Sequence, residues 1–232
     1  TMVSLNRDAC QSSGFRESRK WLKDMEISLA GSYSAIRDFA SRCRQLRSEI
    51  KDIIDKMDFR LLYDEKQELL SIGYNVEDGH LTKSYYDLLA SEARQSSFIA
   101  IAKGDIPQKH WFKLGRPLAL VGDLRVLISW SGTMFEYLMP LLIMRNYDHT
   151  LLDETYAAVI RGQKQFSEQR HLPWGVSESG FYAFDLHLNY QYKAFGIPHL
   201  GLKRGLINDM VVAPYAGILA LPLEPAVAFR NM

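Results

Sequence analysis

The residues best suited to chemistry lie in one aromatic-rich stretch, residues 171–192. Its centre carries the carboxylate of Glu178 in the run GVSESG. Apolar faces of sugar rings pack on aromatic side chains, while carboxylates and amides bond the sugar hydroxyls. Two interpretations stay open: a carbohydrate site around Glu178, or core aromatics with Glu178 solvated on a turn. The aromatic residues of the stretch include Trp174, Phe181, Tyr182, Phe184, Tyr190 and Tyr192.

A second carboxylate, Glu92, lies in a run with helical spacing. Residues 84–102 are predicted to form a helix that begins at Ser84 and ends before Gly104. Glu92 would lie on the apolar, inward side of that helix, and Arg94 would point elsewhere. A buried carboxyl needs a partner or a raised pKa. Pairing with a distant arginine and a catalytic role both remain explanations.

A third carboxylate, Glu136, belongs to the first turn of a helix predicted within residues 129–144. Ser131 or Thr133 could cap this helix, and Pro140 is expected to kink it. The helix dipole favours a carboxylate at this end. A helix-start role and a ligand-contacting role are therefore equally open for Glu136.

Other chemistries have little support in the sequence. The six histidines show no HExxH spacing, and neither a GxSxG nor a GxGxxG pattern occurs. We therefore expect no metal and no cofactor. Carboxylates beside aromatics remain, and glycoside chemistry uses such carboxylates, one protonating the leaving oxygen while another attacks or activates water.

Helices are predicted to position most of these side chains. Residues 1–57 are predicted to be a helical segment of two helices, with a break at Gly31-Ser32. In the second of them, apolar residues recur three and four positions apart and form a stripe that should pack on a neighbour. The stripe contains Ile36, Phe39, Cys43, Leu46, Ile50, Ile53, Ile54 and Met57.

Two small β-hairpins accompany the helices. The first is predicted at residues 59–63 and 69–74, and the second at 118–121 and 125–130, around a Gly-Asp pair. Further helices are predicted at 151–170 and 213–221. The fold class predicted from these elements is mainly α.

The composition of the chain limits the classes of partner that it is expected to bind. The 232 residues hold 28 Lys and Arg against 27 Asp and Glu, a net charge of +1, which disfavours nucleic acid. The start of the chain shows no signal peptide. Residues 210–223 are apolar but number only 14 and contain two prolines, so we expect core and no membrane insertion. The two cysteines, Cys10 and Cys43, suit a reducing compartment.

Several strings, in order, carry a family resemblance. They cover residues 58–74, 84–116, 129–144, 173–186, 195–206 and 211–216, and include ASEAR, SWSGTMFEY and PWGVSES. This set resembles the central glycoamylase-like domain of bacterial cyclic β-1,2-glucan synthases, which is related to endo-β-1,2-glucanases. The resemblance implies an (α/α)6 barrel, of which residues 58–232 would form the N-terminal part.

The resemblance also implies an activity: a retaining transglycosylase that cuts linear β-1,2-glucan and closes it into a ring. Glu178 would be the nucleophile and Glu92 the general acid/base, with Glu136 as a third catalytic candidate. An inverting endo-β-1,2-glucanase and a non-catalytic glucan-binding module are the alternatives. Candidate substrate-binding residues are Asp87, Trp130, Trp174, Tyr182, Tyr190 and Tyr192.

The family's setting supplies the remaining expectations. The resemblance implies a larger polypeptide in which a glycosyltransferase and a phosphorylase-like region flank this domain. It further implies a location on the cytoplasmic face of the bacterial inner membrane, with linear β-1,2-glucan as the partner.

Overall fold

The computed structural model of this chain describes residues 16–232, so Cys10 and the start of the predicted first segment lie outside the described residues. The chain divides into two compact units, residues 1–57 and 58–232. Each unit is described by itself. The chain as a whole is mainly α, as predicted.

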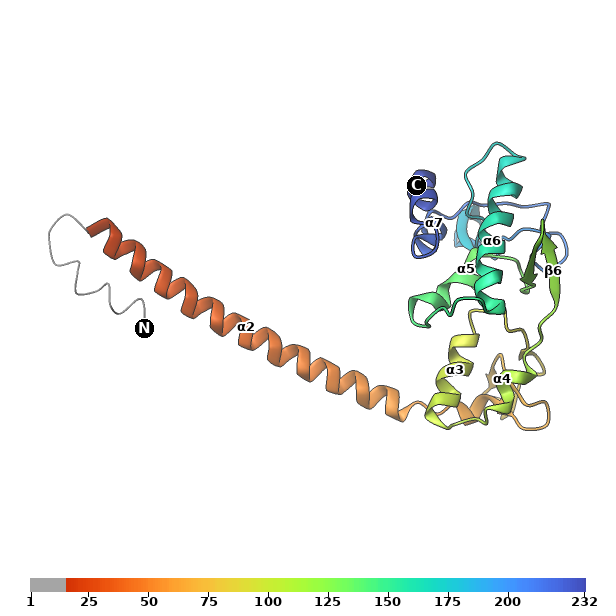
Figure 1. The fold of residues 1–232 in the computed structure, drawn as a ribbon. Coiled ribbons are helices and arrows are strands. Elements are labelled where there is room, and N and C mark those ends of the chain that lie inside the picture. Colours follow the sequence, from red (N-terminus) through yellow and green to blue (C-terminus); the bar gives the residue numbers. More distant parts are fainter. Residues whose placement is uncertain (1–15) are drawn as a thin grey trace. The chain divides into compact units, whose positions relative to one another are not determined.

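In the first unit the described residues form one helix, α2 (Arg16–Lys56), which Figure 1 shows as a continuous coil. The predicted break at Gly31-Ser32 was wrong. A glycine inside a helix costs about 1 kcal/mol, which lowers helix stability without ending the helix when good helix formers flank it. Nothing lies within 4 Å of a Cβ built on Gly31, so no packing constraint explains the glycine.

The second unit begins with short strands. The first predicted hairpin forms, as β1 (Tyr63–Asp64) and β2 (Leu69–Ser71), which pair antiparallel. Its first strand was predicted too early, because residues 59–62 form the 3-10 turn η2 (Phe59–Leu62). β5 (Tyr85–Tyr86) adds to β2, and the order is β1-β2-β5. β3 (Tyr74–Asn75) and β4 (His80–Leu81) form a separate hairpin.

The helix predicted at 84–102 begins ten residues later than expected, as α3 (Arg94–Lys103). Its predicted end is confirmed, because Gly104 caps it with φ +78°. The first residues of the predicted helix form β structure instead: Tyr85 and Tyr86 pair with β2, and Leu88 forms an isolated β-bridge with Gly115. α4 (Lys109–Lys113) follows.

The second predicted hairpin is confirmed, as β6 (Leu118–Val121) and β7 (Leu124–Leu127). It packs on α6 (Leu151–Glu168), the long helix predicted there, which Thr150 caps (Figure 1). The helix predicted within 129–144 is a short α5 (Met134–Leu138) continued by the 3-10 turn η3 (Met139–Leu142), in which Pro140 sits near the start.

The C-terminal part holds one helix that was predicted and two features that were not. α7 (Pro214–Ala220) is the predicted helix, and α8 (Pro225–Asn231) was missed. Within the aromatic-rich stretch, β8 (Ser179–Phe184) and β9 (Tyr190–Lys193) form an unpredicted hairpin. The main core joins residues from most of these elements, among them Val126, Leu127, Met134, Tyr137, Leu138, Val159, Ile160, Val176, Ile197 and Leu200.

Two backbone segments cross with no room for side chains between them. Ile197 N donates to Gly132 O at 3.2 Å. A Cβ on Gly196 would lie 1.8 Å from Ser131 O, and one on Gly201 would lie 2.7 Å from Ser131 C. Gly132 itself has φ +71°. The crossing therefore requires glycine on both sides.

Among the described residues no helix is both long and apolar enough to cross a membrane.

We expect Gly196→Ala to lower the free energy of unfolding by about 3 kcal/mol or more, because the added methyl group overlaps a backbone oxygen that cannot turn aside. Gly73→Ala is the matched control, since its nearest neighbour would be a side-chain methyl at 3.7 Å. Urea unfolding followed by circular dichroism measures both. Equal stability of the two variants would contradict the crossing.

Candidate active site

One cavity of about 460 Å³ brings together five of the predicted site residues. Asp87, Glu92, Trp130, Glu136 and Glu178 all line it, although they come from separate stretches of the sequence. The other lining residues are Ile72, Ser84, Tyr85, Tyr86, Leu88, Ser91, Ser131 and Ala194.

The backbone before Glu178 is held by α6. The side-chain amide of Gln163 donates to Val176 O at 2.9 Å and accepts from Val176 N at 2.8 Å. Gln163 and Val176 are both fully buried, so this pair satisfies polar groups that water does not reach. The result is a fixed backbone two residues before the carboxylate.

Helices α5 and α7 fix the next step of the same backbone. Ser177 Oγ accepts from Phe135 N at 3.0 Å and bonds Tyr215 Oη at 2.8 Å. Tyr215 donates its only hydroxyl proton to Glu178 O at 2.7 Å, so Ser177 must be the donor to Tyr215. Three helices thus converge on residues 176–178.

The Glu178 carboxylate is half-buried and receives a hydrogen bond from Tyr192 Oη to its Oε2. Although the Tyr192 residue is 65% exposed, local desolvation of its phenol, followed by this hydrogen bond and the Glu178 charge, raises the pKa of that phenol. The phenol therefore keeps its proton at neutral pH and acts as a donor. Glu92 also contributes to the raised pKa of Tyr192 through its charge.

Glu92 lies in the turn directly before α3, half-buried, with Ser91 Oγ 3.3 Å from its Oε2. The helical stripe that singled it out was wrong, although Glu92 does line the cavity. Sequence reasoning also missed Arg94, which is 1% exposed. Arg94 donates to Ser91 O, beside Glu92, at 3.0 Å and to Glu136 O at 3.1 Å.

Glu136 has the helix-start role that was left open. Thr133 Oγ1 accepts from Glu136 N at 3.1 Å, and Glu136 Oε2 accepts from Thr133 N at 2.9 Å, a capping box. The carboxylate also accepts from Ser131 N at 2.9 Å and from Ser129 Oγ at 2.8 Å. Burial raises the pKa of Glu136, and these donors oppose that shift. Its lone pairs are largely used inside the protein.

The predicted substrate aromatics divide into two groups. Trp130, 60% exposed, lines the cavity. Trp174 does not: it is buried in the core, and its backbone N and O are both bonded by the Asn231 amide. Tyr182, Tyr190 and Tyr192 are exposed on the β8–β9 hairpin and do not line the cavity, although Tyr192 bonds the Glu178 carboxylate. Tyr182 and Tyr190 are each edge-on to Phe184.

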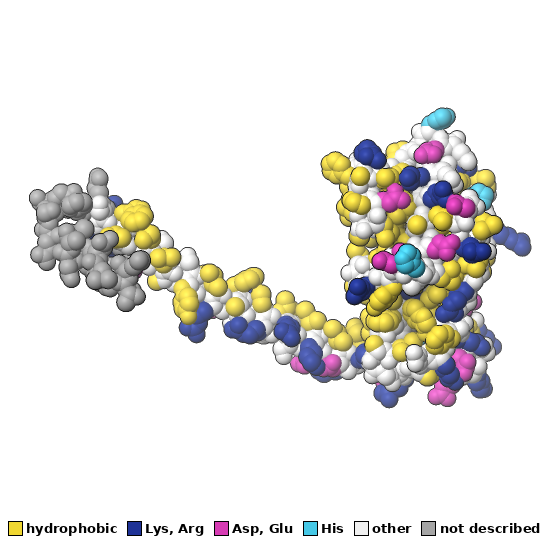
Figure 2. All heavy atoms as spheres, in the orientation of Figure 1, with side chains coloured by type: hydrophobic (Ala, Val, Ile, Leu, Met, Phe, Trp, Pro, Cys, Tyr) yellow, Lys and Arg dark blue, Asp and Glu magenta, His cyan; other side chains and the backbone are white. Residues whose placement is uncertain are grey.

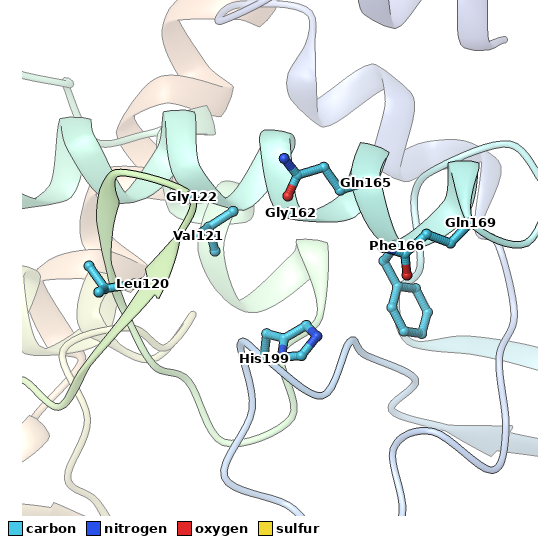
Figure 3. A pocket seen from close by; sticks show the side chains of 8 residues that line it. All are labelled: Leu120, Val121, Gly122, Gly162, Gln165, Phe166, Gln169 and His199. Atoms are coloured by element: carbon cyan, nitrogen blue, oxygen red, sulfur yellow. The ribbon is translucent and has the colours of Figure 1, made fainter.

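A second, smaller cavity of about 220 Å³ lies between α6, the β6–β7 hairpin and the segment around His199 (Figure 3). Its polar lining is Gln165, Gln169 and His199, and no carboxylate is among its described lining residues. It lacks the acid and base groups that glycoside chemistry requires. The larger cavity is therefore the candidate active site.

Comparison with known proteins identifies a family and a relative. Residues 84–232 match the family described as "Putative glucoamylase". The cyclic beta-(1,2)-glucan synthase NdvB of Rhizobium meliloti (strain 1021) is 48% identical over 198 residues, which make up 85% of this chain and 7% of that protein. The chain thus spans a small part of the length of this relative.

We expect Glu136→Gln to destabilise the second unit by about 2 to 3 kcal/mol, because the NH2 group of the new amide would face the N–H group of either Ser131 or Thr133 and leave it without an acceptor. Glu65→Gln, on the exposed β1–β2 turn, is the control and should leave the unfolding midpoint unchanged. Chemical denaturation of both variants checks this. A Glu136→Gln protein as stable as the control would contradict the buried network.

Proposed function

Because the chain belongs to the putative glucoamylase family, we propose that it is a glucan-processing domain of glycoside-hydrolase type. More specifically, we propose that it acts as a retaining transglycosylase on linear β-1,2-glucan and forms cyclic β-1,2-glucan. The Rhizobium relative is named a cyclic beta-(1,2)-glucan synthase, which supports this choice of substrate.

One observation carries the proposal: Glu92 and Glu178, distant in sequence, line the same cavity. Glycoside cleavage needs one carboxyl group that protonates the leaving oxygen. A second carboxylate either attacks the anomeric carbon itself or activates the water that attacks it. The cavity volume of about 460 Å³ is within the range of small-ligand sites. Trp130 at the same cavity offers an exposed aromatic face for a sugar ring.

In the proposed first step, a Glu178 oxygen attacks the anomeric carbon while Glu92 gives its proton to the departing glycosidic oxygen. The carbon–oxygen bond of the linkage breaks, and a glycosyl ester with Glu178 forms. In the second step, Glu92 takes the proton of a hydroxyl at the non-reducing end of the same chain. That oxygen attacks the anomeric carbon, and Glu178 leaves as a carboxylate.

The surrounding contacts support this division of roles. Glu178 accepts a hydrogen bond from Tyr192, which suits a carboxylate that attacks in its charged form. Its backbone is bonded at residues 176–178 by three helices, which fixes the position of the attacking oxygen. Glu136 already accepts hydrogen bonds from Ser129, Ser131 and Thr133, so we propose that it positions the segment carrying Trp130 and takes no part in proton transfer.

We also propose the wider setting. Residues 58–232 would form the N-terminal part of an (α/α)6 barrel, inside a polypeptide with flanking glycosyltransferase and phosphorylase-like regions. The small share of the Rhizobium relative that this chain spans supports flanking regions. The proposed location is the cytoplasmic face of the bacterial inner membrane.

The decisive experiment uses the full-length protein with linear β-1,2-glucan. We expect Glu92→Gln and Glu178→Gln each to lower turnover by about 10³-fold or more, because each removes a group that exchanges protons or bonds with the substrate. Glu77→Gln, on an exposed turn, is the matched control. Mass spectrometry of the products separates rings from shortened linear chains.

Three results would argue against the proposal. Linear products of inverted anomeric configuration, seen by NMR, would instead identify an endo-β-1,2-glucanase. Normal turnover in both variants, with glucan binding retained, would instead identify a binding module. Turnover that needs only one of the two carboxylates would exclude a mechanism in which Glu92 and Glu178 act together.

We expect Tyr192→Phe to lower kcat about tenfold with KM nearly unchanged, because the Glu178 carboxylate loses the donor that orients it. Tyr182→Phe is the matched control, since Tyr182 is 85% exposed and its ring stacks edge-on to the hairpin aromatic Phe184, away from the cavity. Steady-state kinetics on β-1,2-glucan measures both. An equal effect of the two substitutions would contradict a role for the Tyr192 hydroxyl.

A further inference from the structure

The apolar residues of α2 follow a heptad repeat. Alternating steps of three and four run from Leu22 to Met57, one residue past the end of α2, with Ser32 as the polar exception, and they extend N-terminal to the stripe already described. A sustained period of 3.5 residues is typical of coiled-coil seams, whereas an ordinary surface helix follows 3.6. The first core position (a) holds Leu22, Leu29, Ile36, Cys43, Ile50 and Met57. The second core position (d) holds Met25, Ser32, Phe39, Leu46 and Ile53.

This seam is open to solvent in its C-terminal half. Ile36, Phe39 and Ile53 are 67%, 68% and 61% exposed. Figure 2 shows hydrophobic side chains along one side of α2 and Lys and Arg along another. An exposed apolar surface of this extent marks an interaction site. In proteins, most of the stability of an amphipathic helix comes from packing its apolar face on a partner, so we expect another element to cover this face of α2.

The surface of α2 also has the hollow that a coiled coil uses. Phe39, Arg42, Cys43 and Leu46 border a depression of about 390 Å³, together with Gln45 and Glu49. In coiled coils each core side chain of one helix inserts between four residues of the facing helix. These four occupy successive d, g, a and d positions, the frame of such a hole.

We propose that α2 pairs with α2 of a second copy of this chain in an antiparallel two-stranded coiled coil, centred between Arg44 and Gln45. In this register Cys43 faces Leu46 of the second copy, Ile50 faces Phe39, and Ile36 faces Ile53. Every one of these layers is apolar and occurs twice by symmetry. Leu46 of the second copy fills the depression beside Cys43.

Charge selects this register among the alternatives. Arg42 and Glu49 flank the core at g positions, and the proposed register sets Arg42 opposite Glu49 of the second copy on both sides. Moving the antiparallel helices by one heptad sets either Arg42 against Arg42 or Glu49 against Glu49. A parallel pair sets Arg42 against Arg47 twice. Opposite charges at flanking positions decide partner orientation in coiled coils.

Sedimentation of the 232-residue chain tests the pairing. We expect a concentration-dependent shift from the 26.6 kDa monomer to a dimer. Arg42→Glu and Glu49→Arg should each raise the dimer dissociation constant about tenfold, since each replaces two attractions by two repulsions. The double variant should restore it. Arg44→Glu, an equal change of charge on the outer side of α2, is the control and should change nothing.

Crosslinking tests the orientation, in a Cys10→Ser background that leaves Cys43 as the single cysteine. In the antiparallel register two Cys43 side chains are offset along the axis, so mild oxidation should give little dimer. Adding Leu46→Cys sets a second thiol directly opposite Cys43 and should give a disulfide-linked dimer.

Three results would overturn the proposal. The first is a monomer at every concentration with α2 still helical by circular dichroism, which would mean that another segment or protein covers the seam. The second is rapid crosslinking through Cys43 alone, which indicates a parallel pair. The third is equal dissociation constants for Arg42→Glu and Arg44→Glu.

Discussion

The second unit depends on one buried carboxylate whose lone pairs must all be satisfied. Glu136 is 7% exposed, and a carboxylate left without donors at that depth would cost several kcal/mol. The segment before α5 therefore turns back so that the N–H groups of Ser131 and Thr133 and the hydroxyl of Ser129 reach the carboxylate. This turn brings Ser131 O so close to the crossing segment around Gly196 that only glycine fits at position 196. Trp130, in the middle of the turn, is held at the cavity as a result.

The five-residue helix α5 contacts the segments that carry both proposed catalytic acids. Its N-terminus holds the Glu178 side of the cavity, because Phe135 N donates to Ser177 Oγ. Its C-terminus holds the Glu92 side, because Arg94 donates to the carbonyls of Glu136 and Tyr137. Those carbonyls belong to the last turn of a short helix, where few backbone partners exist and a cation is favoured. A helix too short to be stable alone thus fixes the spacing of the site through polar contacts at both ends.

Local chemistry made part of this arrangement predictable from the sequence. The Gly122-Asp123 turn, the Thr133 cap and the Gly104 stop each act on neighbours within a few residues, and each was found where predicted. Two failures at the site, by contrast, involve partners distant in sequence. Tyr85 and Tyr86 have helical neighbours but join β2, a strand formed earlier in the chain, so pairing overrides propensity there. The buried position of Arg94 depends on α5 and on Tyr156, which sequence spacing does not reveal.

Glu92 shows how a useful prediction can follow from a mistaken element. The acid was singled out as a buried member of a helical stripe, yet it lies in a turn where no such stripe exists. What places it at the cavity is its neighbour Arg94, whose guanidinium also bonds Ser91 O. Because that guanidinium is buried, burial lowers its pKa, while the Tyr156 hydroxyl and the charge of Glu92 oppose the shift. Glu92 therefore stabilises the same cation that positions it, so the proposed acid/base and the framework around it are electrostatically linked.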